Sequence, residues 1–146
     1  MSNSQVSVDY PVFEASTTAD ASVTADVMRR FNTAFIEHDP SGLADLVGED
    51  CVMDSVQPAP NGTRYVGRAA CVEFWEALAL DRNTQFTPEE VMVAGDRAVI
   101  RWRVRFGGDD VNAVFGDMDA NSVSGVNLML VRDGRIVEAF GYTKTP

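Results

Sequence analysis

The sequence predicts an α+β domain in which helices pack on one face of a curved antiparallel sheet. Three observations lead to this fold class. Apolar residues recur at helical spacing up to Leu80, they alternate at period two after Asp81, and the last segment places an Asp-Gly turn between two apolar runs. A chain of 146 residues with 45% hydrophobic content is long enough for one domain with a sizeable core.

The first predicted helix spans residues 21–37. Its apolar residues recur at steps of three and four and form one buried face: Val23, Val27, Met28, Phe31, Ala34 and Phe35. Residues 1–20 are rich in Ser, Thr, Ala and Asp, which predicts a loosely ordered arm, although its apolar residues, Tyr10 and Phe13 among them, could dock on a partner surface. Residues 21–146 are expected to form the single domain.

Two shorter helices and one strand are predicted next along the chain. Pro40 ends the first helix, and Ser41 can cap a short second helix. A strand follows at about Asp50–Val56, and a cluster of turn residues after it predicts an irregular loop over 57–62. A third helix is expected over 67–79, with Val72, Trp75 and Leu78 on one face.

Alternation at period two then predicts two strands, Glu90–Ala94 and Arg97–Phe106, joined by a hairpin turn. The second strand has one apolar and one basic face, formed by Ile100, Trp102, Val104 and Phe106 and by Arg101, Arg103 and Arg105 respectively. The following loop, Gly107–Asn121, is too long and too apolar for a simple turn, which makes it a candidate lid or rim.

The segment Gly125–Thr143 predicts a terminal β-hairpin, because Asp133-Gly134 supplies the positive φ angles of a tight turn. Both faces of its first strand carry apolar side chains, so we expect this strand to be covered on both sides. Asn127 is the polar exception. A buried amide without partners costs roughly 1–3 kcal/mol, so Asn127 is either satisfied internally or available to a ligand.

Composition narrows the classes of partner. Twelve basic against 22 acidic residues give a formal charge of −10, which repels phosphate backbones and anionic lipids, so we expect no nucleic-acid or membrane partner. No secretory signal or bilayer-spanning run is recognised. Cys51 and Cys71 stand in apolar contexts and are predicted to be buried free thiols in a reducing cytoplasm. One histidine and two scattered cysteines provide no zinc or iron ligand set, so no metal is expected.

Three segments resemble those of SnoaL-like and ketosteroid isomerase-like proteins of the NTF2-like superfamily: Phe31–Asp39, Gly67–Trp75 and Gly125–Glu138. Their order and spacing extend the resemblance from about Val23 to Thr143. It implies a cone, in which a bent sheet wraps around the long first helix with two further helices, around a deep apolar pocket that uses no cofactor. Members include steroid isomerases, polyketide cyclases, epoxide hydrolases, dehydratases and non-catalytic binders, so the fold alone does not give the function.

The resemblance places Asp54 where the isomerases have a proton-shuttling aspartate. A carboxylate near an apolar pocket has a raised pKa, which makes it a better base near neutrality. The start of the strand is one residue shorter than in the isomerases, however, and a slip of one residue would point Asp54 to the other face. A catalytic base and a solvated or loop-capping aspartate are therefore both open interpretations.

Asn127 matches a position where these isomerases and cyclases carry an aspartate. An amide can donate a hydrogen bond to a carbonyl or enolate oxygen but cannot exchange a proton, so Asn127 is either an oxyanion donor or a satisfied core amide. Phe31 replaces the tyrosine donor of the isomerases. The residues expected to contact a ligand in the cone are Phe31, Phe35, Trp75, Trp102 and Met129.

The leading hypothesis is a cofactor-independent acid/base enzyme of isomerase, cyclase or dehydratase type that acts on an apolar polycyclic or polyketide-like carbonyl compound. In it Asp54 moves a proton while Asn127 polarises the oxygen. The alternative is a non-catalytic protein that binds a hydrophobic small molecule or serves as a scaffold. A third hypothesis is an epoxide hydrolase using Asp54, Arg101 and an unidentified acid, although Arg101 could equally pair with acids on an outer or dimer surface. The apolar sheet faces also predict a homodimer.

Overall fold

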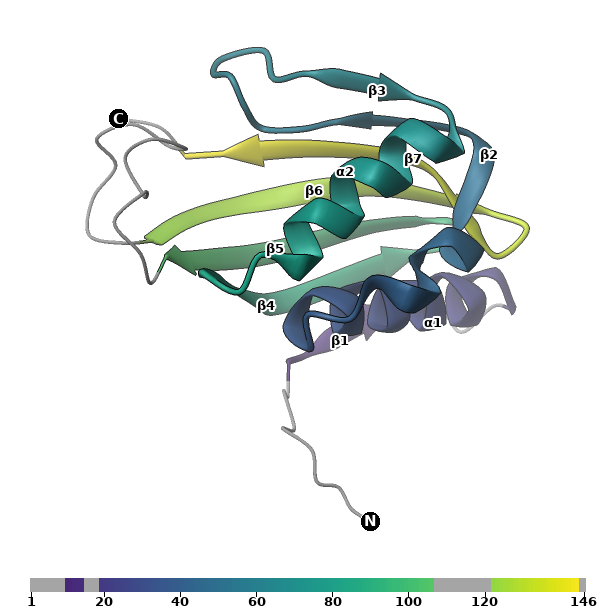
Figure 1. The fold of residues 1–146 in the computed structure, drawn as a ribbon. Helices are drawn as coiled ribbons and strands as arrows, with labels where there is room; N and C mark the ends of the chain where they lie inside the picture. The colour runs from purple at the N-terminus through teal and green to yellow at the C-terminus, as the bar shows by residue number, and fades with distance from the viewer. Residues whose placement is uncertain (1–9, 15–18, 107–121, 145–146) are drawn as a thin grey trace.

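The computed structural model describes residues 10–14, 19–106 and 122–144, so the predicted loop at 107–121 lies outside the described residues. The elements in chain order are β1 Val12–Glu14, α1 Ala19–Ile36, the 3-10 helix η1 Pro40–Leu46, β2 Val47–Asp54, β3 Arg64–Val66, α2 Arg68–Leu80, β4 Thr84–Ala94, β5 Arg97–Phe106, β6 Ser122–Arg132 and β7 Arg135–Thr143 (Figure 1). This order confirms the α+β class.

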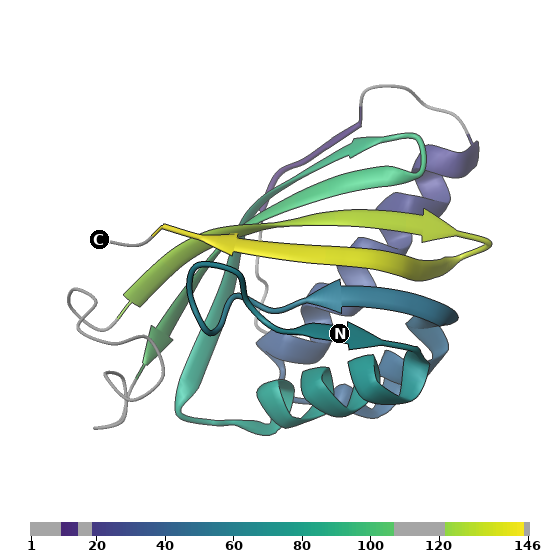
Figure 2. The ribbon, with the colours of Figure 1, turned by 90° about the horizontal axis from the view of Figure 1, so that it is seen from above.

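The described strands form one seven-stranded sheet in the order β1-β4-β5-β6-β7-β2-β3. Strands β4 to β7 form the predicted antiparallel meander, whereas β2 pairs with β7 and β1 pairs with β4 in parallel. The sheet is therefore mixed and not purely antiparallel. The two parallel pairs join segments that are distant in sequence, so local sequence patterns did not predict them. Figure 2 shows the strands curving, with both α-helices against the same side of the sheet.

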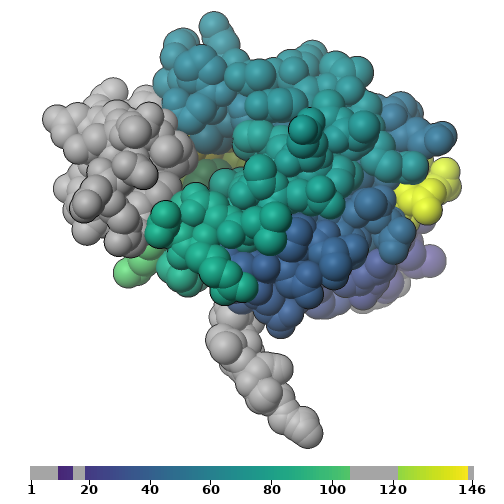
Figure 3. All heavy atoms as spheres, viewed as in Figure 1, coloured from purple at the N-terminus to yellow at the C-terminus, as the bar shows by residue number. Residues whose placement is uncertain are grey.

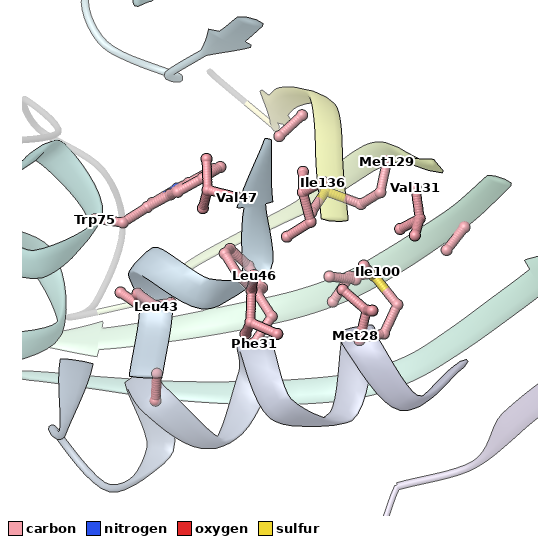
Figure 4. Close-up of a cluster of buried hydrophobic side chains, with 14 of the residues drawn as sticks. Met28, Phe31, Leu43, Leu46, Val47, Trp75, Ile100, Met129, Val131 and Ile136 are labelled. Carbon is pink, nitrogen blue, oxygen red and sulfur yellow. The ribbon is translucent and has the colours of Figure 1, made fainter. Parts of the chain in front are cut away.

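The core lies between the sheet and the helices, and α2 and η1 cover the face seen in Figure 3. Met28 of α1 points toward Ile100 of β5 (Figure 4). Met28 and Ile100 are fully buried, and burying such a side chain stabilises the fold by about 1.5–3 kcal/mol. The apolar face of the helix and the apolar face of the sheet thus pack against each other in one core.

The second helix is capped differently from the prediction. The side chain of Asp39, and not that of Ser41, caps η1, and its carboxylate accepts a hydrogen bond from the Ser41 backbone N–H at 3.1 Å. The reason is the position of Pro40. Proline is well suited to the first turn of a helix, so the capping position moves to the residue before it.

Several strands differ from the predictions. Strand β4 begins at Thr84 instead of Glu90, because a register shift between Pro88 and Glu90 interrupts the alternation. Strand β2 begins earlier than expected, at Val47, and the short strand β3 was not predicted at all. A strand of three residues contains too little sequence for a periodic signal.

Part of the predicted arm is ordered against the same chain. Strand β1 adds to the edge of the sheet, where the Val91 N–H donates to the Pro11 carbonyl oxygen at 2.9 Å. Tyr10 packs against the core, and its hydroxyl lies 3.5 Å from Nδ2 of the buried Asn32. Residues 1–9 and 15–18 of the arm lie outside the described residues.

The terminal hairpin is confirmed. Asp133 and Gly134 have φ angles of 54° and 75°, as the tight turn requires. The inner face of β6 is buried at Met129 and Val131. Its outer face is only partly covered in the single chain, since Leu128 is 40% exposed, which differs from the expected cover on both sides.

Candidate functional site

A cavity of about 430 Å³ lies between the inner face of the sheet and the helices, lined mainly by apolar side chains. A hollow is visible in the space-filling view between α2 and the segment that joins β2 to β3 (Figure 3). Small-molecule sites in proteins have volumes of roughly 300–1,000 Å³. Aromatic residues supply much of the wall: Phe31, Phe35, Tyr65, Phe74, Trp75, Phe86 and Trp102.

The aromatic rings pack against one another along the cavity wall. The Phe31 ring centroid lies 4.9 Å from that of Phe35 and 5.0 Å from that of Trp75, both in edge arrangements. Phe86 connects this group to the sheet, at 5.6 Å from Phe35 and 6.3 Å from Trp102. Aromatic pairs at such separations contribute about 0.5–1.5 kcal/mol beyond their burial, so the cavity has a well-fixed wall.

Four of the five residues expected to contact a ligand line the cavity, namely Phe31, Phe35, Trp75 and Trp102. Met129 does not line it. Its side chain is 1% exposed and belongs to the buried hydrophobic core cluster (Figure 4). Met129 follows Asn127 on the same face of β6, but it is opposite the buried Ala98 of β5 and lies within the core.

Sequence reasoning missed several residues of the wall: Tyr65, Phe74, Phe86 and Val104. Phe86 and Val104 are partners in the β4–β5 register, so they lie on the same face of the sheet. Strict alternation back from Val91 would place Phe86 on the outer face, because the register shift between Pro88 and Glu90 exchanges the two faces, so the period-two pattern alone misses it. Tyr65 belongs to β3, a strand of three residues that is too short to show a periodic sequence pattern.

Asn127 lies on the inner face of the sheet and contributes an amide to the cavity. Its Oδ1 accepts a hydrogen bond from the Trp102 indole Nε1–H at 3.2 Å. In the β6–β7 register Asn127 faces Gly141, where an added Cβ would lie 3.1 Å from Oδ1. The missing side chain at Gly141 therefore leaves room for the Asn127 amide.

Asp54 is placed differently from the expectation. It borders the cavity, but the register pairs it with Phe140 of β7, whereas Met53 pairs with the buried Ala139 on the inner face. Asp54 and Phe140 therefore belong to the outer face. The Asp54 carboxylate binds the Arg64 guanidinium in two contacts, Oδ1 to Nε at 2.7 Å and Oδ2 to a terminal nitrogen at 2.9 Å.

The expected rise in the pKa of Asp54 is wrong. The hydrogen bond from Arg64 holds the pKa of the Asp54 carboxyl below its usual value, against the smaller opposing effect of desolvation. A carboxylate with a lowered pKa is a weaker base near neutrality. The orientation of Asp54 was uncertain from the sequence, because a shift of one residue along a strand moves a side chain to the other face.

Arg101 lies on the outer face and pairs with acids, as one of its two interpretations predicts. It bonds Glu89 at 2.8 Å and Glu90 at 2.7 Å, and Arg103 also contacts Glu89. Strands β6 and β7 separate β5 from β2, so at a spacing of about 4.8 Å the strands of Arg101 and Asp54 are about 14 Å apart. The structure does not bring this pair together to hold a water molecule.

The polar rim of the cavity is largely satisfied by local hydrogen bonds. Ser55 Oγ donates to the Gln57 carbonyl oxygen at 3.0 Å and accepts from the Thr63 N–H at 3.3 Å. On the other side of the rim, an Asp81 carboxylate oxygen accepts from the Asn83 N–H at 2.9 Å. Within the described residues, no three histidine, cysteine or acidic side chains are grouped to hold a metal ion.

Cys51 and Cys71 are both free and buried, as predicted. Burial raises the pKa of the Cys51 thiol, and the neighbouring Cys71 adds to the effect. Cys71 Sγ lies 3.6 Å from the Cys51 carbonyl oxygen, a contact between α2 and β2. In the described ranges, no helix is long and apolar enough to cross a membrane.

A bent sheet, a long first helix and a cavity lined by aromatic side chains define a cone of the NTF2-like class. The sequence profile of the SnoaL-like domain matches residues 28–139, and the chain belongs to this family. This membership confirms the family resemblance of the sequence. Among curated proteins, no sequence matches this chain.

Solved structures of similar proteins share the fold. An NTF2-like protein of unknown function from Mesorhizobium loti is 47% identical with a TM-score of 0.78, and the match covers 92% of this chain and 99% of that one. A candidate ketosteroid isomerase from Kribbella flavida is 18% identical with a TM-score of 0.67, over 87% and 82% of the two chains. An LEH-like epoxide hydrolase from M. tuberculosis is 14% identical with a TM-score of 0.66, over 88% and 83%. The latter two similarities show the fold alone.

Proposed function

We propose that this protein binds an apolar small molecule with a carbonyl oxygen in its aromatic cavity, and that the Asn127 amide contacts that oxygen. The observation that carries the proposal is one amide held in the inner wall of a cavity of about 430 Å³ whose surface is otherwise mainly apolar. Apolar walls supply most of the binding free energy, while a few placed polar groups orient the ligand. This is the binding-protein hypothesis of the sequence analysis.

The position of Asp54 favours binding over acid/base catalysis. A general base has to come within hydrogen-bonding reach of the proton that it removes. The Asp54 carboxylate instead bonds Arg64 on the outer face, and this contact lowers its pKa. The cavity therefore contains an amide that can donate to a ligand oxygen, while the Asp54 carboxylate is bound by Arg64 on the outer face.

The test is a binding titration of the purified protein against a panel of apolar cyclic ketones, followed by isothermal calorimetry. We expect saturable binding, weakened about two- to tenfold in Asn127→Leu, which is the range for one neutral hydrogen bond. The matched control is Ser124→Ala, on the outer face of the same strand, which should bind like the wild type. Failure of every ketone to bind would reject the proposal, as would equal affinity for wild type and Asn127→Leu.

A second candidate is the acid/base enzyme of isomerase, cyclase or dehydratase type. It is favoured by one observation, that Asp54 and Asn127 border the same cavity, and the similarity to a candidate ketosteroid isomerase is in keeping with it. In this case the Asp54–Arg64 pair opens when substrate binds, and Asp54 moves a proton while Asn127 stabilises the enolate oxygen.

Turnover of a β,γ-unsaturated cyclic ketone distinguishes the two candidates. The enzyme hypothesis predicts that Asp54→Asn reduces the rate by about 10²–10⁴-fold, the usual contribution of a general base. It also predicts that Arg64→Gln, which removes the partner that lowers the Asp54 pKa, raises activity near neutrality. Equal rates in wild type and Asp54→Asn would leave the binding function as the remaining candidate.

A further inference from the structure

We infer that Trp102 fixes the Asn127 amide as a one-way hydrogen-bond donor, so that the cavity selects ketones over alcohols of the same skeleton. The inference rests on the proposed binding function and names the feature of the ligand that the site recognises. Trp102 is a positioning residue here, since it acts through Asn127. The ligand class is an apolar compound whose oxygen accepts hydrogen bonds and carries no proton.

The direction of the amide follows from the chemistry of its partner. An indole N–H can only donate, so the Asn127 atom that faces it at 3.2 Å has to be the carbonyl oxygen Oδ1. The amide nitrogen Nδ2 then takes the other position. Rotating the amide by a half-turn would bring two donors together, which Trp102 prevents.

The Nδ2 group is free to meet a ligand. Among the described residues, no hydrogen bond from Nδ2 is found, and Asn32 Oδ1 is the only buried side-chain polar atom without a partner. Nδ2 is therefore not sealed in the protein interior, and Asn127 lines the cavity. A buried amide group without a partner would be costly, whereas one that is open to the cavity can donate to a bound oxygen.

Two glycines make the space in which this pair is held. Gly125 is opposite Trp102 in the β5–β6 register, and an added Cβ there would lie 2.6 Å from two carbons of the indole ring. Gly141 is opposite Asn127 in the β6–β7 register, where an added Cβ would lie 3.1 Å from Oδ1 and 3.1 Å from a Val56 methyl carbon. The indole of β5 and the amide of β6 therefore meet across two neighbouring strands, in space that Gly125 and Gly141 leave open.

A fixed donor discriminates between oxidation states of one carbon skeleton. A ketone oxygen accepts from Nδ2 and leaves no proton unplaced. An alcohol oxygen can also accept, but its own O–H would then have to share Oδ1 with the Trp102 N–H, which already takes one of the two lone pairs of that oxygen. Loss of one neutral hydrogen bond corresponds to about a two- to tenfold difference in affinity, and we expect the ketone to bind more tightly by that factor.

The experiment compares 1-tetralone, 1-tetralol and tetralin by calorimetry on the full chain. Wild type should bind the ketone more tightly than the other two compounds. In Trp102→Phe the indole N–H is absent, so the amide can rotate and accept from the alcohol, and the ketone-to-alcohol affinity ratio should fall toward one. Using the ratio removes the effect of the smaller ring on general binding.

A second variant keeps the indole and reverses the polarity of the site. In Asn127→Asp, measured at pH 8, the carboxylate accepts from Trp102 and from an alcohol but repels a carbonyl oxygen, so the alcohol should bind more tightly than the ketone. The carbonyl stretch of bound tetralone should lie at lower frequency in wild type than in either variant. Ser124→Ala should leave the ratio and the frequency unchanged.

The outcomes separate the inference from the function on which it rests. If the compounds bind but Trp102→Phe retains the wild-type ratio, or Asn127→Asp still prefers the ketone, the inference is overturned and the binding function stands. If wild type binds none of the three compounds, both are overturned. A reduced ratio in Trp102→Phe together with a reversed ratio in Asn127→Asp supports the inference, and melting curves establish that each variant is folded.

Discussion

Asp54 and Asn127 show how the face of a strand decides what a polar side chain can do. Asn127 faces inward, where its oxygen is bound by Trp102 and its nitrogen is available to the cavity. Asp54 faces outward, where Arg64 is its partner and the Arg64 guanidinium also lies 5.6 Å from the centroid of the Phe140 ring. The first residue is therefore a candidate for ligand recognition, while the second is held in a surface ion pair.

Asp54→Asn should lower stability in a pH-dependent way. Because Arg64 lowers the folded-state pKa of Asp54, the stabilisation by this pair is fully present above the ordinary carboxyl pKa of about 3.9 and is lost as pH falls through the lowered value. Wild type and variant should therefore differ slightly at pH 7, as is typical of exposed ion pairs, and converge near pH 2. Urea unfolding at both pH values measures this, and a difference that grew on acidification would contradict it.

The two cysteines should be unreactive in the folded protein. Burial raises the pKa of both the Cys51 and the Cys71 thiols, and each unit of raised pKa lowers the thiolate population about tenfold. Labelling with a thiol reagent at pH 8 should be slow in buffer and fast in denaturant, where both thiols react. Rapid native labelling of either cysteine would show that the α2–β2 contact opens readily.

At the scale of elements, the sequence predicts best those helices and strands whose formation depends on residues within the same segment. The β6–β7 hairpin was predicted because Asp133 and Gly134 supply the left-handed turn residues between two apolar runs. The start of β4 was missed because a register shift after Pro88 breaks the alternation. Strands β1 and β3 are short edge strands whose pairing partners, β4 and β2, lie elsewhere in the chain.

The hairpin turn allows a matched test of backbone strain. Gly134 has a φ of +75° and no atom within 4 Å of an added Cβ, so Gly134→Ala should destabilise by about 1–2 kcal/mol through conformation alone. Gly42 in η1 also has open space around an added Cβ but no positive φ, so Gly42→Ala should be neutral or slightly stabilising. Chemical denaturation compares the two, and equal effects would mean that the turn can relax.

At the scale of the whole molecule, the outer face of the sheet carries a row of apolar side chains. The strand registers align Phe13, Met92, Val99, Leu128 and Phe140 across five strands. Phe13, Met92 and Leu128 are between 40% and 54% exposed in the single chain. An exposed row of this kind, flanked by Arg–Glu pairs, is typical of an interaction surface.

We therefore expect a homodimer that covers this row. Light scattering should give a mass of about twice 15.9 kDa at micromolar concentration, and Leu128→Lys should shift it toward the monomer because a charge would be buried in the interface. Val23→Lys is the control, since Val23 is similarly exposed but lies on α1. A wild-type mass near 15.9 kDa would contradict the expectation.

The sequence by itself determined the features that depend on neighbours along the chain. Helical periodicity defined α1 and α2 to within about two residues, alternation and turn residues defined the β5–β7 meander, and the order of these elements specified the α+β class and the SnoaL-like resemblance. The aromatic residues Phe31, Phe35, Trp75 and Trp102 could be predicted as cavity residues because the bent sheet of the family places them around one space.

Only the tertiary structure decided the features that depend on register between distant segments. The parallel pairing of β2 with β7 turns Asp54 outward to Arg64, and the alignment of β5, β6 and β7 brings Trp102, Asn127 and Gly141 together. A shift of one residue in either pairing would exchange the inner and outer faces, and no single segment encodes that choice. The same reason applies to Met129, whose register partners are the buried Ala98 and Ala139 and which belongs to the core cluster instead of the cavity wall.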